Sequence, residues 1–191
     1  MLDYLKSIDT HLLLFINGKH SDFFDFVMYW VSNKYIWIPF YLFLLYLVIK
    51  KFEYNSLYII LAVVILLVLS DQISSHLIKN LVQRPRPCHE ISLAGLVRSI
   101  NNECGGEYGF LSSHATNCFA IATFVIMIIG KTYRYLIPLL LIWAALVSYS
   151  RIYLGVHYPG DVLCGTILGI AIGIGIGKLY FYLIRNKLDN A

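Results

Sequence analysis

The sequence contains few charged residues. Only 14% of its 191 residues are Asp, Glu, Lys or Arg, whereas 59% are hydrophobic and the mean hydropathy is +0.69. A soluble domain carries about 25% charged residues, because its surface must be solvated by water. The shortage of charge excludes an ordinary soluble domain and indicates one integral membrane domain over residues 1–191.

Three further features are missing, and each argues against a class of protein or site. The cations lie in separate loops with no continuous basic surface interleaved with aromatic residues, so we expect no nucleic acid partner. No His, Asp and Glu residues have the spacing of a two-metal phosphatase, so we expect neither a metal nor another cofactor. A basic start followed by an apolar stretch and a small-residue cleavage site is missing, so we expect no cleavable signal peptide.

Long apolar runs dominate what is present, and most approach the ~20 residues that a helix needs to cross a bilayer. The apolar side chains of residues 1–16 recur at helical spacing over too short a run to cross, which predicts an amphipathic helix in the membrane interface. The expected fold class is all-α, a polytopic bundle whose motif-bearing core covers about residues 57–184. Five spanning helices are predicted, at residues 35–49, 57–78, 115–129, 135–149 and 162–184.

The number of cations on each side does not decide the orientation in the membrane. If the cations near the motifs described below are held by function, the remaining excess places the loops 50–56 and 130–134 in the cytoplasm. The motif loops then face the opposite side. The short chain and compact loops favour a bacterial inner membrane, so we expect the site at the periplasmic face.

Three motifs stand at the ends of different predicted helices, on one membrane face. Arginine offers a planar donor fork that suits phosphate oxygens, and histidine titrates near neutral pH, so these residue types together suit phosphoryl chemistry. The motifs are Lys79 with Arg86-Pro87, then Ser112-Ser113-His114, then Ser150-Arg151 with His157 and Asp161.

The third motif pairs a nucleophile or base, His157, with a carboxylate that can orient its ring, Asp161. If the segment after Pro159 is helical, Asp161 lies in its first turn, where a carboxylate suits the helix dipole. In the second motif, Ser112 is expected to be the N-cap of a helix. The free N–H groups of that helix start would form an anion site.

The series Lys-x6-Arg-Pro, Ser-x-His and Ser-Arg-x5-His-x3-Asp resembles the type 2 phosphatidic acid phosphatase family, which shares its helical core with vanadium haloperoxidases. The resemblance brackets residues 79–161. The middle motif departs from the family's usual Pro-Ser-Gly-His, because Leu111 and Ser113 stand at the Pro and Gly positions. The resemblance implies a metal-independent membrane lipid phosphatase that forms a phosphohistidine.

The resemblance also implies a role for each motif residue. His157 would be the nucleophile, oriented by Asp161. His114 would protonate the departing oxygen and then activate the water that releases phosphate. The implied phosphate-binding groups are Lys79, Arg86, Arg151 and the backbone of Ser112, Ser113 and His114.

Several residues outside these roles are also singled out. Arg84 is an accessory candidate that would bind a second phosphate or a lipid headgroup. Asp71 is an acid within the membrane, with either a functional role or, as we favour, a bond to a neighbouring helix. Cys88 and Cys104 lie in the long connection 80–110, where an oxidising periplasm would allow a disulfide. Four glycines spaced four apart predict close helix packing: Gly165, Gly169, Gly173 and Gly177.

The expected substrate is a membrane lipid phosphate, bound with its tail in the bilayer. The candidates are an isoprenyl pyrophosphate, phosphatidic acid, phosphatidylglycerol phosphate and a lipid A phosphate, with the isoprenyl carrier or a glycerophospholipid placed first. The alternative function is a catalytically silent, phospholipid-binding membrane scaffold or transporter, against which the intact His114, His157 and Asp161 argue. The sequence gives no oligomeric state.

Overall fold

The computed structural model describes residues 2–100 and 104–189, and the side chains of residues 3–100 and 104–184. In this part of the chain every regular element is a helix, apart from an isolated bridge between Pro85 and Tyr108. Residues 101–103 of the long connection lie outside the described residues. The all-α prediction is confirmed.

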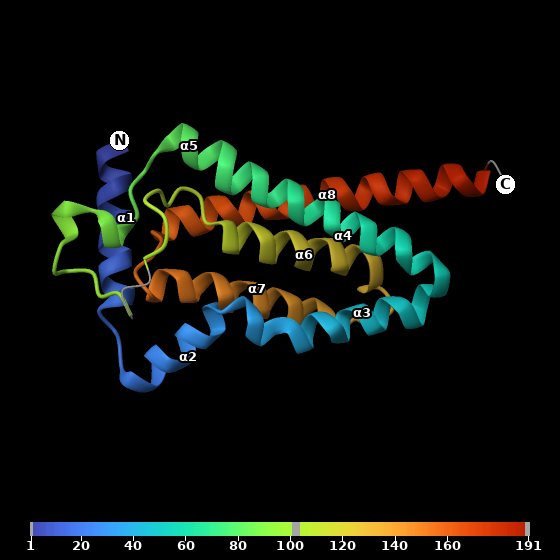
Figure 1. The fold of residues 1–191 in the computed structure, drawn as a ribbon, viewed down its shortest axis with the longest axis horizontal. Coiled ribbons are helices and arrows are strands. Elements are labelled where there is room, and N and C mark those ends of the chain that lie inside the picture. The colour runs from blue at the N-terminus through green and yellow to red at the C-terminus, as the bar shows by residue number, and fades with distance from the viewer. Residues whose placement is uncertain (1, 101–103, 190–191) are drawn as a thin grey trace.

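Five apolar helices run along the long axis of the molecule (Figure 1). Among the described residues, three helical stretches are long and apolar enough to cross a membrane: Lys34–Val82, Leu136–Tyr153 and Pro159–Ile184. The first of them contains two of the five helices, which fold back on each other. The five are α3 (Ile38–Phe52), α4 (Ser56–Asp71), α6 (Ser113–Ile129), α7 (Leu136–Tyr153) and α8 (Pro159–Asp189). This architecture confirms the predicted polytopic bundle.

Shorter helices connect or extend these five. α3 follows η1 (Lys34–Trp37) and is joined to α4 by η2 (Glu53–Asn55). The end of the α4 span is a π-helix, η3 (Gln72–Ile78), followed by one turn of α-helix, α5 (Lys79–Val82). The long connection after α5 contains η4 (Pro87–His89) and η5 (Ile91–Leu93).

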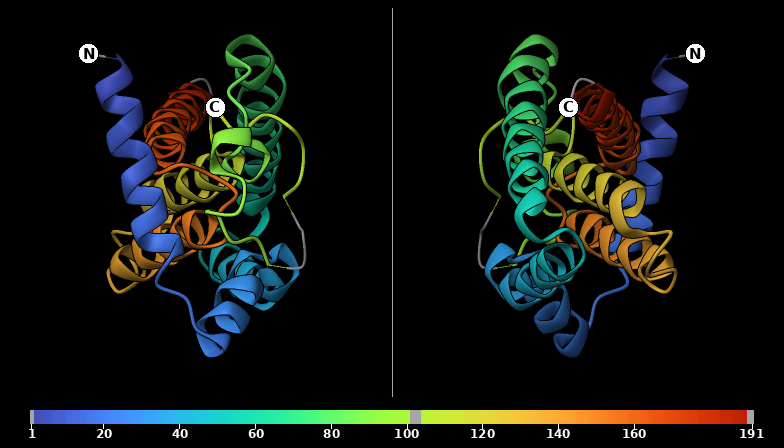
Figure 2. Two further views of the ribbon diagram at one scale, coloured as in Figure 1. Left: turned by 90° about the vertical axis from the view of Figure 1, so that its left-hand side faces the viewer. Right: turned by 90° about the vertical axis from the view of Figure 1, so that its right-hand side faces the viewer.

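The N-terminal helix α1 (Leu2–Asn17) lies across one end of the bundle, and α2 (Asp22–Ser32) leads from it towards α3 (Figures 1 and 2). Its outward side carries exposed apolar side chains, including Leu5, Leu12 and Phe15, whereas Leu13 and Asn17 are buried. A helix across the bundle end with an outward apolar side agrees with the predicted interfacial helix.

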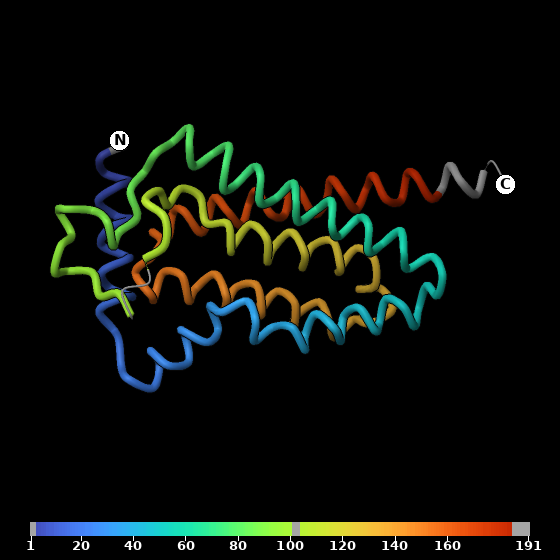
Figure 3. Tube along the Cα trace, in the orientation of Figure 1, coloured from blue at the N-terminus to red at the C-terminus, as the bar shows by residue number. Residues whose placement is uncertain are grey.

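The helices α6 and α8 pack at close range along the predicted glycine series. A Cβ atom at Gly165 would lie 2.6 Å from the carbonyl oxygen of Ser112, and one at Gly173 would lie 2.8 Å from that of Ala120. Because no side chain fits at these positions, the two backbones approach each other directly. The contact sets the N-terminal ends of α6 and α8 side by side, at the same end of the bundle as α1 (Figure 3).

Candidate active site

A cavity of about 790 Å³ opens between α3, α4 and α6. Much of its wall is apolar and includes Leu44, Val63 and Ile121. Its polar lining brings together residues of all three motifs. The polar side chains are Lys34, Asp71, Ser75, Lys79, Arg86, Ser113, His114, Asn117, Arg151 and His157.

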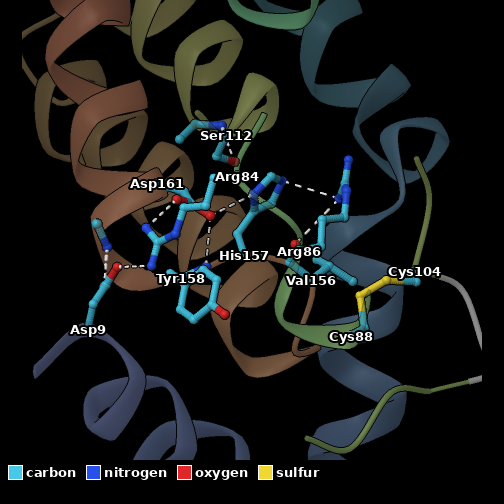
Figure 4. A network of polar contacts seen from close by, with 12 residues as sticks. Asp9, Arg84, Arg86, Cys88, Cys104, Ser112, Val156, His157, Tyr158 and Asp161 are labelled. Carbon is cyan, nitrogen blue, oxygen red and sulfur yellow. Dashed lines mark hydrogen bonds and ion pairs between the residues drawn. A yellow bond between two sulfur atoms is a disulfide. The ribbon is translucent and has the colours of Figure 1, made fainter. Parts of the chain in front are cut away.

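His157 is buried in the connection between α7 and α8, with 1% of its surface exposed. Its Nδ1 lies 3.5 Å from Oδ2 of Asp161, and its Nε2 lies 3.4 Å from Nη1 of Arg86 (Figure 4). Because Arg86 can only donate, this geometry favours the proton on Nδ1 and the lone pair on Nε2. The Nδ1–Oδ2 contact is longer than the about 2.7–3.2 Å of a normal hydrogen bond. Catalytic contacts are often long before substrate binds.

Burial lowers the pKa of His157 well below its ordinary value, and the positive charges of Arg86, Arg151 and Lys79 lower it further. A group with so low a pKa is neutral at pH 7. Nε2 therefore carries a lone pair, which faces Nη1 of Arg86, without needing a base to remove a proton first. This is the protonation state that a nucleophilic histidine requires.

Asp161 is fully buried in the first turn of α8 and is held from several directions. Its Oδ2 accepts from the Tyr158 N–H at 3.0 Å, and its Oδ1 accepts from Nη1 of Arg84 at 2.9 Å. Its carbonyl oxygen accepts from the Ser112 N–H at 3.0 Å. The last bond ties the start of α6 to the start of α8.

Arg84 points away from the cavity and into this network. Besides Asp161, its Nη2 donates to Oδ2 of Asp9 at 2.8 Å, and its guanidinium lies 3.8 Å from the centroid of the Tyr158 ring. Both ends of the donor fork are therefore used by carboxylates. This arrangement does not fit the expected contact of Arg84 with a second phosphate or a headgroup.

Ser112 is the N-cap of α6, as predicted, since its Oγ accepts from the Ala115 N–H. Ser112 is fully buried, however, and its own N–H is already bonded to Asp161. The predicted anion site therefore loses one of its donors. The remaining backbone donors are the N–H groups of Ser113 and His114, which have no acceptor within the helix because they lie in its first turn.

On another side of the cavity, hydroxyl groups connect the start of α6 to the end of the α4 span. Oγ of Ser113 lies 2.8 Å from Oγ of Ser75, which also donates to Oδ1 of Asp71 at 3.1 Å. Asp71 thus bonds within its own helical segment, and Ser75 carries the link to α6. Arg151 donates to Oγ of Ser32, which connects the third motif to α2.

The long connection is folded back on itself beside the site. The Arg86 N–H donates to the Glu107 carbonyl at 3.0 Å, and the Gly109 N–H donates to the Arg84 carbonyl at 2.8 Å. Cys88 and Cys104 form a disulfide that closes the same connection (Figure 4). These bonds hold Arg86 against His157.

The three motifs and the helices that carry them match a known family along most of the chain. A model of the PAP2 superfamily matches residues 56–185. The chain belongs to the PAP2 superfamily. The first helices, α1 to α3, precede the matched residues.

Individual proteins agree with this membership. The chain is 40% identical over 190 residues to the lipid A 4'-phosphatase of Bacteroides thetaiotaomicron, across 98% of this chain and 81% of that protein. It is 34% identical over 185 residues to the lipid A 4'-phosphatase of Porphyromonas gingivalis, across 95% and 76%. The crystal structure of a transmembrane PAP2 type phosphatidylglycerolphosphate phosphatase from Bacillus subtilis has a TM-score of 0.69 and 18% identity. That alignment covers 92% of this chain and 86% of the other, and it shows the shared fold.

This PAP2 member is an integral-membrane lipid phosphatase. Several polar residues of its site were missed by the sequence reasoning, namely Asp9, Lys34, Ser75 and Asn117. Lys34 lines the cavity from η1, and Asp9 reaches the network around Asp161 from α1. The signal for Asp9 is its spacing with Leu13 and Asn17, which puts a carboxylate on the inward side of an amphipathic helix.

Proposed function

We propose that the chain hydrolyses a phosphate monoester of a lipid A-type glycolipid at the periplasmic face of a bacterial inner membrane. Two relatives that match nearly the whole chain are lipid A 4'-phosphatases, which supports this substrate. A lipid A phosphate therefore moves ahead of the isoprenyl carrier and the glycerophospholipids that the sequence alone placed first.

One observation carries the proposal: the apolar cavity between α3, α4 and α6 ends at the motif residues. An acyl chain in the apolar part would hold its phosphate next to His157. Fixing the reacting groups in this way converts part of the binding energy into correct orientation. The Cys88–Cys104 disulfide at the motif end suits an oxidising compartment, which supports the periplasmic face.

In the first step, Nε2 of His157 attacks phosphorus. A P–N bond forms while the P–O bond to the lipid breaks, and His114 donates a proton to the leaving oxygen. Asp161 accepts a hydrogen bond from the Nδ1–H of His157. Its negative charge stabilises the positive charge that develops on the imidazole ring. Phosphoryl transfer spreads negative charge over three oxygens, so fixed cations and N–H donors supply most of the stabilisation. The donors are Lys79, Arg86, Arg151 and the N–H groups of Ser113 and His114.

In the second step His114 acts as a base, because it became neutral when it gave its proton to the leaving oxygen. Specifically, His114 accepts a proton from a water molecule whose oxygen attacks phosphorus. The P–N bond breaks, inorganic phosphate leaves and His157 returns to its neutral state. The two histidines thus divide the nucleophile and acid–base roles between them.

The test compares kcat/KM for phosphate release across pure lipid phosphates in detergent. The panel is a lipid A phosphate, phosphatidic acid, phosphatidylglycerol phosphate and an isoprenyl pyrophosphate. We expect the lipid A phosphate to be favoured by at least about tenfold, a difference that pocket contacts can supply. A higher kcat/KM for another lipid would contradict the substrate, and no release from any lipid would favour a silent binding protein.

The proposed steps use protein cations where other phosphatases use metal ions. Activity should therefore be unchanged in excess chelator. Loss of activity on chelation, with recovery on adding Mg²⁺ or Zn²⁺, would refute this part of the proposal.

A further inference from the structure

The helix α1 brings a carboxylate to the edge of the active site. Oδ2 of Asp9 accepts from Nη2 of Arg84 at 2.8 Å, and its Oδ1 accepts from the Gly160 N–H at 2.7 Å (Figure 4). The side chain of Asp9 is 13% exposed. Asp9 lies before residue 56, where the family match begins, so none of the three motifs includes it.

The space that Asp9 occupies exists because residue 160 has no side chain. A Cβ atom at Gly160 would lie 2.8 Å from Oδ2 of Asp9 and 3.2 Å from its Cγ. Gly160 is the second residue of α8, where an N–H has no acceptor within the helix and a carboxylate suits the positive end of the dipole. The structure thus contains a fitted position for this carboxylate.

Arg84 donates to two carboxylates, and the way it is shared decides which oxygen of Asp161 faces His157. One end of its guanidinium bonds Oδ1 of Asp161 and the other end bonds Asp9, which leaves Oδ2 of Asp161 facing Nδ1 of His157. An arginine beside a single carboxylate tends to bond both of its oxygens as a bidentate pair. Without Asp9, Arg84 would turn towards Oδ2 and compete with His157 for it.

We propose that Asp9 is a positioning residue for the phosphatase reaction, because it holds Arg84 in the geometry that leaves Oδ2 of Asp161 to His157. The inference rests on the proposed function, since it takes His157 as the nucleophile. Asp9 acts through Arg84 and Asp161. It is not among the described residues that line the cavity. Its loss should therefore lower kcat and leave KM nearly unchanged.

The test measures kcat and KM for a short-chain phosphatidic acid in detergent, together with the single-turnover rate of phosphoenzyme formation. Asp9→Asn keeps the size of the side chain and removes its charge, and it should lower kcat about tenfold, since a hydrogen bond to a charged group contributes on that scale. Asp9→Glu should retain more activity than Asp9→Asn. KM should stay within about twofold in each variant.

Two further variants separate the charge of Asp9 from general damage. Gly160→Ala changes no charge but displaces Asp9, so it should lower kcat by a similar factor. Asp3→Asn is the matched control, because Asp3 is an exposed acid on the same helix, and it should behave like the wild type. Size-exclusion chromatography and the thermal midpoint report whether each variant is folded.

The outcomes separate this inference from the proposed function. If His157→Ala is inactive and Asp9→Asn keeps the wild-type kcat, the role of Asp9 is overturned and the proposed function stands. A loss confined to KM, or one that follows the folded fraction, also overturns it. If His157→Ala remains active, the proposed nucleophile itself is wrong.

Discussion

The two histidines of the site lie near the starts of neighbouring helices, but their surroundings differ. His157 is enclosed by groups that already bond one another, through Asp161, Arg84 and Asp9. Both histidines line the cavity, but His114 belongs to α6, one of the three helices that form its apolar walls. The comparison indicates a preorganised side that fixes the proposed nucleophile and a second side that would receive the substrate.

The largest effect should come from the preorganised side. His157→Ala removes the proposed nucleophile and should lower kcat by at least ~10³-fold while the bundle stays folded. Rapid-quench trapping should find a phosphoenzyme in the wild type and none in the variant. Near-full activity of His157→Ala would contradict its role as the nucleophile, and with it the distinction between the two sides.

On the cavity side, His114→Ala should lower the rate by ~10²- to 10⁴-fold, because general acid–base catalysis contributes on that scale. The loss should be smaller for a pyrophosphate substrate, since a good leaving group needs less protonation. The measurement is the ratio of wild-type to variant kcat for a pyrophosphate and for a phosphomonoester. Equal ratios would argue against the acid role of His114.

A third prediction concerns the apolar part of the cavity. Ile121→Trp should fill part of the cavity and exclude some of the lipid tail. Because each buried CH₂ contributes ~0.8 kcal/mol to binding, KM for a long-chain lipid phosphate should rise about tenfold. A short-chain substrate should be affected less than twofold. Ile142→Trp is the control, since Ile142 is exposed on the outer surface of α7. Equal effects on both chain lengths would place the tail elsewhere.

The smallest effect on activity should come from the disulfide beside Arg86. Replacing Cys88 and Cys104 together by Ser removes a cross-link between positions 16 apart, and a loop of this size is stabilised by ~3 kcal/mol. We expect a lower thermal midpoint and a loss of kcat below about tenfold. Cys164→Ser, which removes a free thiol, is the control. Both thiols open to alkylation in non-reduced, denatured wild-type protein would contradict the disulfide.

Much of the fold could be predicted because membrane spans depend on local apolar length. The convergence of the motifs at one end of the bundle also followed from counting spans, since each span reverses the side on which the chain emerges. The π-helix Gln72–Ile78 could not be predicted in this way. Residues aligned by α-helical spacing are not aligned in a π-helix, whose wider turn follows from its i→i+5 bonding.

The predicted anion site shows the same limit at the level of single bonds. Residue type and helix start correctly predicted the capping role of Ser112. They did not predict that the Ser112 N–H is bonded to the Asp161 carbonyl, because this bond depends on the close packing of α6 against α8. The free donors of the helix start therefore begin one residue later than expected.

The sequence by itself determined the membrane class, the helical bundle and the chemical types gathered in the motifs, since these depend on composition and on spacing within short segments. The tertiary structure alone decided that Arg84 supports Asp161 and that Asp9 holds Arg84. The residues of that network lie 75 and 77 positions apart in the chain. Contacts at such separations arise from packing of whole helices, and no local pattern encodes them.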